Sequence, residues 1–206
     1  IVAGCLPDID STELKKHFKG LIVPWKKDAK LLSGVFDCRQ CSLEEVDNIW
    51  VEENFCSDLE SYKLANPDSN VTFHDQFIKM VVSRGCNYEC SYCSERHAFP
   101  AYQSFDEEKL IDKCKRMITK TGCKNVMLLA DSLGEYGKDS NTNLINLINK
   151  ICDIEEGVKV ALNNLNPGCF IRMFEGLTSL AESSRIAHLN LPIQSASDDI
   201  LKLMSR

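Results

Sequence analysis

The chain has 206 residues, of which 44% are hydrophobic and 26% are charged, and its formal net charge is −6. This composition is typical of a soluble globular protein with one large domain, or with a small domain and a larger one. We find no uncharged apolar run long enough for a transmembrane helix and no secretory signal peptide, so we expect a cytoplasmic protein without membrane contact. The acidic balance disfavours a strong nucleic-acid binder, because phosphate contacts need clustered Lys and Arg.

The eleven cysteines are a high and odd number. Without a secretory signal, they indicate thiols and metal ligands of a reducing cytosol, not disulfides. The sequence begins at Ile1 inside a strand-like segment and ends at Arg206 inside a helical pattern, so we expect a fragment of a longer protein.

The first part of the chain, residues 1–53, is predicted to be part of a small α/β domain. "IVAGC" is strand-like, "STELKKHF" is helical, and "CSLEEVDNIW" contains a capping box from Ser42 to Glu45. Residues 54–72 are polar and lack a clear period, which favours a linker. Residues 73–206 are then predicted to form a second domain.

Strand-like and helix-like segments alternate through this second domain. The strand-like segments are apolar: 77–82, 125–130, 158–162 and 186–193. The predicted helices run from a Ser104–Glu107 capping box to a stop at Gly122, through 141–154, through 169–182, and onward from Ser197 as N-cap. Four βα units predict a parallel sheet with right-handed crossovers, either a barrel or a doubly wound sheet.

Function collects at the carboxyl ends of the strands in both folds. Four unusual loops are predicted at such ends: 85–93, 131–139, 163–168 and 194–197. Their convergence on one face predicts a functional site there.

The loop "GCNYECSYC" places Cys86, Cys90 and Cys93 in a C-x3-C-x2-C spacing. A structural zinc site closes with four ligands, for which His97 is a candidate fourth. A cubane iron–sulfur cluster held by only three thiolates would instead leave one iron open to bind and activate a small molecule. Both interpretations remain open from the spacing alone.

With the aromatic Tyr92 before its last cysteine, this loop resembles that of the radical S-adenosylmethionine (SAM) superfamily. The resemblance implies a parallel (βα) barrel, a [4Fe–4S] cluster on Cys86, Cys90 and Cys93, and SAM bound to the open iron. It further implies reductive cleavage of SAM to a 5′-deoxyadenosyl radical, for which the protein orients the cofactor and excludes water. The expected fold is therefore α/β, a partial barrel of this type preceded by part of a small α/β domain.

Further stretches resemble one branch, the methylthiotransferases that modify transfer RNA or a ribosomal protein. They are "VAGCLP", "SRGCNYECSYC", "EYGKD", "LNPG" and "LPIQSASDDILKLMSR", and several look closest to the branch acting on threonylcarbamoyladenosine in tRNA. Members carry three N-terminal cysteines that hold an auxiliary cluster, and Cys5 resembles the third. The "FPAYQSF" stretch departs from the family's Arg-rich pattern and leaves the substrate open.

The resemblance implies methylthiolation of an unactivated C–H in a modified adenosine next to the anticodon. Its implied partners are tRNA, an electron donor such as a flavodoxin or ferredoxin, and a sulfur donor, with a second cluster in the full-length protein. The alternatives are radical modification of a ribosomal protein or peptide, which the acidic charge favours, and a non-catalytic zinc-bound interaction module.

Five further residues are cofactor-binding candidates through the same resemblance. Tyr92 resembles the aromatic that lies against the adenine, and Asp131 the polar group near the SAM amino end. Gln194 and Ser195 resemble the SAM-facing pair, and Asn163 ends the third strand. The competing interpretations are a packed aromatic, an N-cap or turn residue, a helix cap at Ser195 and a loop role for Asn163.

The remaining candidates are weaker. Tyr136 lines the substrate pocket or packs under its loop. Cys38 and Cys41 form a "CRQC" pair that we interpret as incidental thiols, and Cys114 and Cys152 lie on apolar helix faces as small hydrophobes.

Overall fold

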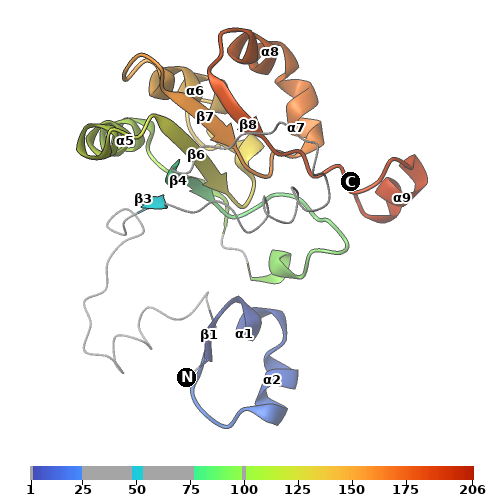
Figure 1. Ribbon diagram of the computed structural model, residues 1–206. Coiled ribbons are helices and arrows are strands. Elements are labelled where there is room, and N and C mark those ends of the chain that lie inside the picture. Colours follow the sequence, from blue (N-terminus) through green and yellow to red (C-terminus); the bar gives the residue numbers. More distant parts are fainter. Residues whose placement is uncertain (1, 25–47, 53–76, 99–100) are drawn as a thin grey trace, which may run out of the picture. The chain divides into compact units, whose positions relative to one another are not determined.

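The computed structural model describes residues 2–24, 48–52, 77–98 and 101–206, which form two compact units (Figure 1). The first unit comprises Ile1–Val46, Arg84–Tyr102 and Ile193–Arg206, and the second comprises Asp47–Ser83 and Gln103–Pro192. The predicted linker 54–72, the Ser42 capping box and the Cys38–Cys41 pair lie outside the described residues. The predicted domain boundaries at 53 and 73 therefore stay predictions.

The described part of the first unit contains short elements. Strands β1 (Val2–Gly4) and β2 (Ile22–Pro24) pair in parallel and are joined by helices α1 (Cys5–Ile9) and α2 (Ser11–His17). The carboxylate of Asp10 caps α2 by accepting the Glu13 N–H. The 3-10 helix η2 (Ser94–His97) and helix α9 (Asp198–Leu203) complete this part.

The second unit is built on a mixed sheet with the order β3-β4-β6-β7-β8. Its strands are β3 (Ile49–Glu52), β4 (Phe77–Arg84), β6 (Asn125–Ala130), β7 (Lys159–Leu162) and β8 (Ile186–Leu189), and the short β5 (Gln103–Ser104) also pairs with β4. Strands β4, β6, β7 and β8 run parallel, which confirms the predicted parallel sheet.

The parallel strands follow one another in sequence order, without the reversal that marks a doubly wound sheet. In Figure 1, α5 (Glu107–Thr121), α6 (Leu144–Cys152) and α8 (Phe174–Glu182) lie along one face of this sheet. Sequential strand order with the helices on one face is the arrangement of a (βα) barrel segment. The expected partial α/β barrel is therefore confirmed for the βα repeats of the second unit.

The core explains why these helices pack there. Ile78 and Val126 are register partners on neighbouring strands, and both are fully buried. The helices contribute fully buried apolar residues such as Leu110, Leu147 and Ile151. Residues next to Ile78 and Val126 in their strands point to the other face of the sheet, where Phe77, Met127 and Ala161 form a buried cluster.

Local capping differs from the prediction in two places. Helix α5 is capped by Asp106, whose side chain accepts the Lys109 N–H, so the predicted Ser104–Glu107 capping box is wrong. The predicted stop at Gly122 is confirmed, since this glycine takes the left-handed conformation with φ 70°.

Two predicted elements have different bounds in the structure. The helix predicted over 169–182 is divided at Met173 into α7 (Pro167–Arg172) and α8. Strand β8 ends at Leu189, short of the predicted 193. The segment 49–52, predicted within the N-terminal piece, instead pairs antiparallel with β4 at the edge of the sheet, where Ile49 is 4% exposed.

Candidate functional site

The cysteine loop begins directly where β4 ends. Gly85 turns the chain with φ 80°, a left-handed conformation that a side chain would disfavour. The loop is then braced from within, since the Tyr88 N–H donates to Cys86 Sγ at 3.4 Å and the Cys93 N–H donates to the Cys90 carbonyl at 3.1 Å. A hydrogen bond to sulfur is the kind of contact that stabilises a thiolate ligand.

All three loop cysteines are free thiols. Cys86 and Cys93 are half-buried, while Cys90 is 8% exposed. Within the described ranges, no three His, Cys, Asp or Glu side chains are grouped as the ligands of a single metal ion. A cluster spreads its thiolates over separate irons, farther apart than the ligands of one ion, and three free thiols on one short loop suit that donor set.

Tyr92 lies exposed on this loop, beside Arg206 from the end of α9. The Arg206 guanidinium carbon is 6.0 Å from the centroid of the Tyr92 ring, a cation–π distance. Partial desolvation raises the pKa of Tyr92 above its ordinary value, and the Arg206 charge opposes that rise. The ring is 48% exposed, so it offers area for a stacking partner.

Gln194 and Ser195 belong to the same unit as the cysteine loop. Gln194 is exposed and holds φ 71°, an uncommon conformation for a residue with a side chain. Ser195 Oγ accepts the N–H of Ser197, the N-cap residue of α9, at 3.1 Å. This hydrogen bond supports the interpretation of Ser195 as a residue that helps to cap α9. A SAM-facing role for Gln194 and Ser195 stays a prediction.

Asp131 and Asn163 belong to the second unit and follow neighbouring strands. Asp131 comes directly after β6 and Asn163 directly after β7, and both are half-buried. Because β6 and β7 are parallel partners, these two side chains stand at the same edge of the sheet. Their assignment to SAM stays a prediction.

The 131–139 loop is fixed by contacts to the segment that precedes α5. Tyr136 is 2% exposed and its hydroxyl donates to the Phe105 carbonyl at 3.1 Å, so it packs under the loop. The Gly137 N–H donates to Ser104 Oγ at 2.9 Å, and the Ser104 N–H donates to Asp139 at 2.8 Å.

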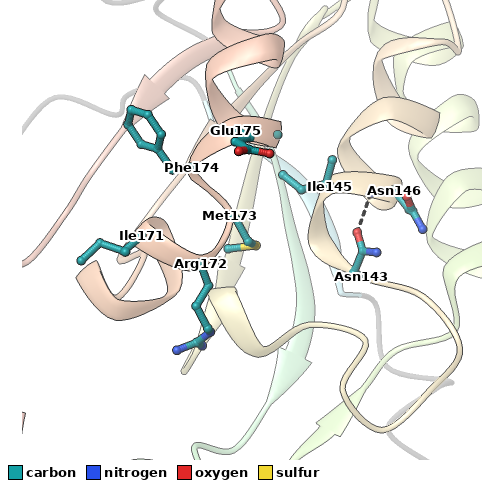
Figure 2. Close-up of a pocket in the computed structure, with 9 residues that line it drawn as sticks. Asn143, Ile145, Asn146, Ile171, Arg172, Met173, Phe174 and Glu175 are labelled. Atoms are coloured by element: carbon teal, nitrogen blue, oxygen red, sulfur yellow. Dashed lines mark hydrogen bonds between the residues drawn. The ribbon is translucent and has the colours of Figure 1, made fainter.

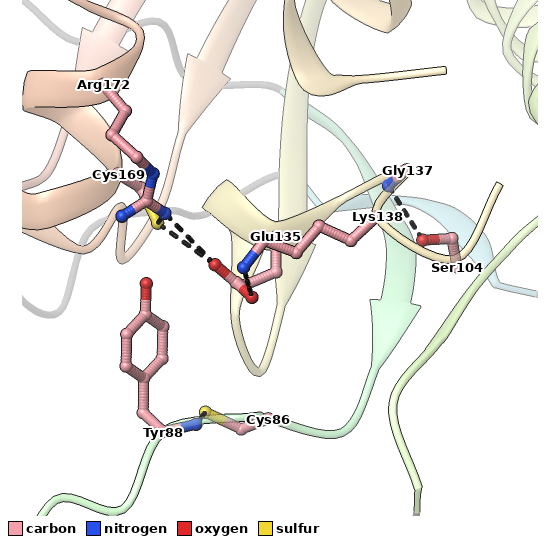
Figure 3. Close-up of polar contacts among 8 residues, drawn as sticks. All are labelled: Cys86, Tyr88, Ser104, Glu135, Gly137, Lys138, Cys169 and Arg172. Carbon is pink, nitrogen blue, oxygen red and sulfur yellow. Dashed lines mark hydrogen bonds and ion pairs between the residues drawn. The ribbon is translucent and has the colours of Figure 1, made fainter. Parts of the chain in front are cut away.

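A buried acidic group in this loop has no counterpart in the sequence prediction. Glu135, which ends the 3-10 helix η3 (Leu133–Glu135), is 1% exposed and pairs with Lys138 and with Arg172 of α7, the latter at 3.3 Å (Figure 3). The Cys169 thiol also donates to Glu135, at 3.7 Å. The sequence around Glu135 is polar and gives no signal of its burial, and its partner on α7 is 37 positions away in sequence.

The second unit also contains an open cavity of about 820 Å³ between the start of α6 and the α7–α8 junction (Figure 2). Its wall mixes amides and a guanidinium with apolar side chains, among them Asn143, Asn146, Arg172, Met173 and Phe174. None of the predicted cofactor-binding residues lines it.

Cys5 is the first residue of α1, and α1 contacts η2, which follows the cysteine loop within the same unit. A role of Cys5 in an auxiliary cluster stays a prediction.

The Radical SAM superfamily profile matches residues 80–206, more than half of the chain and including the whole cysteine loop. The chain belongs to the radical SAM superfamily. Membership implies SAM and a [4Fe–4S] cluster as its cofactors, and the free thiols of the loop fit that cluster. Among the described residues of this radical SAM protein, no helix is long and apolar enough to cross a bilayer.

Several curated relatives carry closely similar names. Probable threonylcarbamoyladenosine tRNA methylthiotransferases from Methanothermobacter thermautotrophicus and Pyrococcus abyssi are each 28% identical over 207 residues, covering 100% of this chain and 46% of theirs. The human threonylcarbamoyladenosine tRNA methylthiotransferase is 32% identical over 127 residues, or 61% of this chain and 22% of its own. The radical SAM chain thus spans about half the length, or less, of the curated relatives it matches.

A solved radical S-adenosylmethionine methyltransferase from Kitasatospora setae, with cobalamin and a [4Fe-4S] cluster bound, is also similar. It aligns with 60% of this chain and 23% of its own at a TM-score of 0.47 and 17% identity, a level that carries no argument about function.

Proposed function

We propose that this chain is the radical SAM part of a methylthiotransferase that inserts a methylthio group into threonylcarbamoyladenosine of tRNA. The observation that carries the proposal is the loop of three free thiols at the carboxyl end of β4, in a chain that aligns over its full length with proteins of that name. The substrate base lies next to the anticodon in this proposal.

The loop cysteines have the central role. Cys86, Cys90 and Cys93 would hold the cluster, and three thiolates leave one of its irons free for SAM. With SAM bound, the cluster would supply the electron that cleaves SAM to a 5′-deoxyadenosyl radical, and this radical would abstract hydrogen from the substrate. The chain's own residues would orient and shield the cofactor: the exposed Tyr92 ring would stack on the adenine, and Asp131 would contact the amino end of SAM.

The remaining parts of the proposal rest on partners. An electron donor such as a flavodoxin or ferredoxin would reduce the cluster, and a sulfur donor would feed an auxiliary cluster to which Cys5 contributes. We place the activity in the cytoplasm, because tRNA is found there and because cysteines stay reduced as thiols in that compartment.

The net charge of −6 favours a second candidate substrate, a ribosomal protein or another peptide. A basic peptide would be attracted to an acidic surface that repels RNA phosphates. Both substrates belong in the same assay.

The test begins with anaerobic reconstitution using iron and sulfide. We expect about four irons and four sulfides per loop, a brown chromophore, and loss of both in Cys90→Ser. Cys123→Ser is the matched control, because Cys123 is also 8% exposed but lies outside the loop. One zinc per chain without sulfide would contradict the proposal.

The second step adds SAM, reductant and unmodified tRNA or ribosomal protein, with mass spectrometry of each. With the full-length protein, which is expected to carry the second cluster, formation of 5′-deoxyadenosine together with a methylthiolated adenosine in tRNA is the expected result. A methylthiolated peptide with unchanged tRNA would replace the proposed substrate by the second candidate.

A further inference from the structure

The carbonyl groups at the C-terminal end of α9 (Asp198–Leu203) all have hydrogen-bond donors. The last carbonyls of a helix have no partner within it and need outside donors. Two of them, on Leu201 and Lys202, accept from the turn that follows: the Arg206 N–H reaches Leu201 at 2.9 Å and the Ser205 N–H reaches Lys202 at 3.0 Å. This pair of bonds is a Schellman motif.

The turn residue of this motif is a serine in the position where glycine is usual. Ser205 has φ 55°, the left-handed conformation that a residue with a side chain rarely adopts. The reversal that Ser205 makes carries Arg206 back over the Tyr92 ring. Contacts elsewhere must therefore hold the turn in place.

Those contacts come from the cysteine loop. The next two carbonyls of α9 both accept from Ser91: its hydroxyl donates to Leu203 at 2.9 Å and its backbone N–H donates to Met204 at 3.0 Å. Ser91 thus supplies the donors that α9 lacks, across 112 positions of sequence. Together with the Tyr92–Arg206 contact, these bonds form what we call the clasp, between residues 91–92 and 203–206.

Ser91 lies between two of the cluster ligands, Cys90 and Cys93. A site with three cysteines on one loop needs that loop held before the cluster arrives, because contacts around the ligands orient them. The clasp provides such a hold without using any ligand atom. It also leaves the exposed side of the Tyr92 ring available.

We propose that Ser91 is a positioning residue, which ties the ligand loop to the end of α9 and so sets the stability of the bound cluster and its response to SAM. This inference rests on the proposed cluster at Cys86, Cys90 and Cys93. Arg206 is the second member of the clasp, through its cation–π contact with the Tyr92 ring.

The test compares three variants of the reconstituted protein. Ser91→Ala removes the hydroxyl bond, and Ser91→Thr keeps a hydroxyl. Ser94→Ala is the control, because Ser94 is an exposed serine nearby whose hydroxyl makes no hydrogen bond to the described residues. One lost hydrogen bond of about 1 kcal/mol corresponds to about fivefold. We expect iron release to a chelator about fivefold faster in Ser91→Ala, and rates near wild type in Ser91→Thr and Ser94→Ala.

Two further readouts separate positioning from general destabilisation. With SAM bound, the electron paramagnetic resonance signal of the reduced cluster should be broader in Ser91→Ala than in wild type. The wild-type line width should return in Ser91→Thr. Amide hydrogen exchange over 198–206 in the cluster-free protein should be faster in Ser91→Ala alone.

The outcomes are distinct. Unchanged iron release and unchanged exchange in Ser91→Ala would overturn the inference, as would equal effects in Ser94→Ala. A wild-type protein that takes up no cluster would contradict the proposed function, while the exchange measurement would still decide whether Ser91 holds α9.

Discussion

Replacing Lys138 and Arg172 together by methionine would leave the carboxylate of Glu135 buried without its two cations. Glu135 is 1% exposed, so water cannot replace them. A buried carboxylate in that position takes up a proton instead of staying charged. Protonating a glutamate of ordinary pKa about 4.3 at pH 7 costs about 1.36 kcal/mol per pH unit, or about 3.7 kcal/mol.

This figure is an upper limit for the double variant, since the Cys169 thiol still donates to the carboxylate. Its pH dependence follows in sign: the folded variant holds the proton while the unfolded chain releases it above about pH 4.3, so the penalty grows as pH rises. We expect a loss of up to about 3.7 kcal/mol at pH 7 and up to about 1 kcal/mol at pH 5, relative to wild type.

The converse change should cost less. Glu135→Gln removes the anion that pairs with Lys138 and Arg172, whose side chains are already 56% and 55% exposed. Water can solvate both cations, so the expected loss in the free energy of unfolding is about 1 kcal/mol. Urea denaturation at pH 5 and pH 7 measures all three quantities. A double-variant loss as large at pH 5 as at pH 7, or smaller than that of Glu135→Gln at pH 7, would refute the reasoning.

Three further predictions concern single groups. Burial raises the pKa of Cys114 to about 12 and of Cys152 to about 11, so both should resist alkylation at pH 8 while the loop thiols of the cluster-free protein react; rapid labelling of either would contradict this. Burial lowers the pKa of His188, so the folded state holds fewer protons than the unfolded chain, and stability should fall as pH drops below about 6.5. Thermal melts at several pH values would show this slope, and His188→Gln should flatten it. Gly137→Ala should cost at least about 1 kcal/mol by denaturant titration, because φ is 84° there and a methyl group would overlap a carbonyl oxygen five residues on; an unchanged midpoint would count against it.

Several features follow from short stretches of sequence. The strand predicted over 125–130 is β6 with the same bounds, because an uninterrupted apolar run suits a strand buried on both faces. Gly122 ends α5 for a local reason, the left-handed conformation. The spacing of Cys86, Cys90 and Cys93 likewise fixes the three thiols on one loop, whatever surrounds it.

Other features depend on partners that are distant in sequence. Ser104 and Asp106 are both suitable helix caps, and the choice falls to Asp106 because Ser104 is engaged by Gly137 and Asp139. The helix predicted through 169–182 contains no proline at the break, yet it divides at Met173. Such choices are decided by packing, which short-range periodicity does not contain.

The sequence by itself determined the alternation of strands and helices, the position of the ligand loop and the thiol chemistry of that loop, because each depends on residues within a few positions of one another. Only the tertiary structure decided that the parallel strands run in sequence order, that Glu135 meets Arg172, and that Ser91 caps α9. These contacts form between segments that are far apart along the chain, and they exist only where folding has offset the entropy of bringing those segments together.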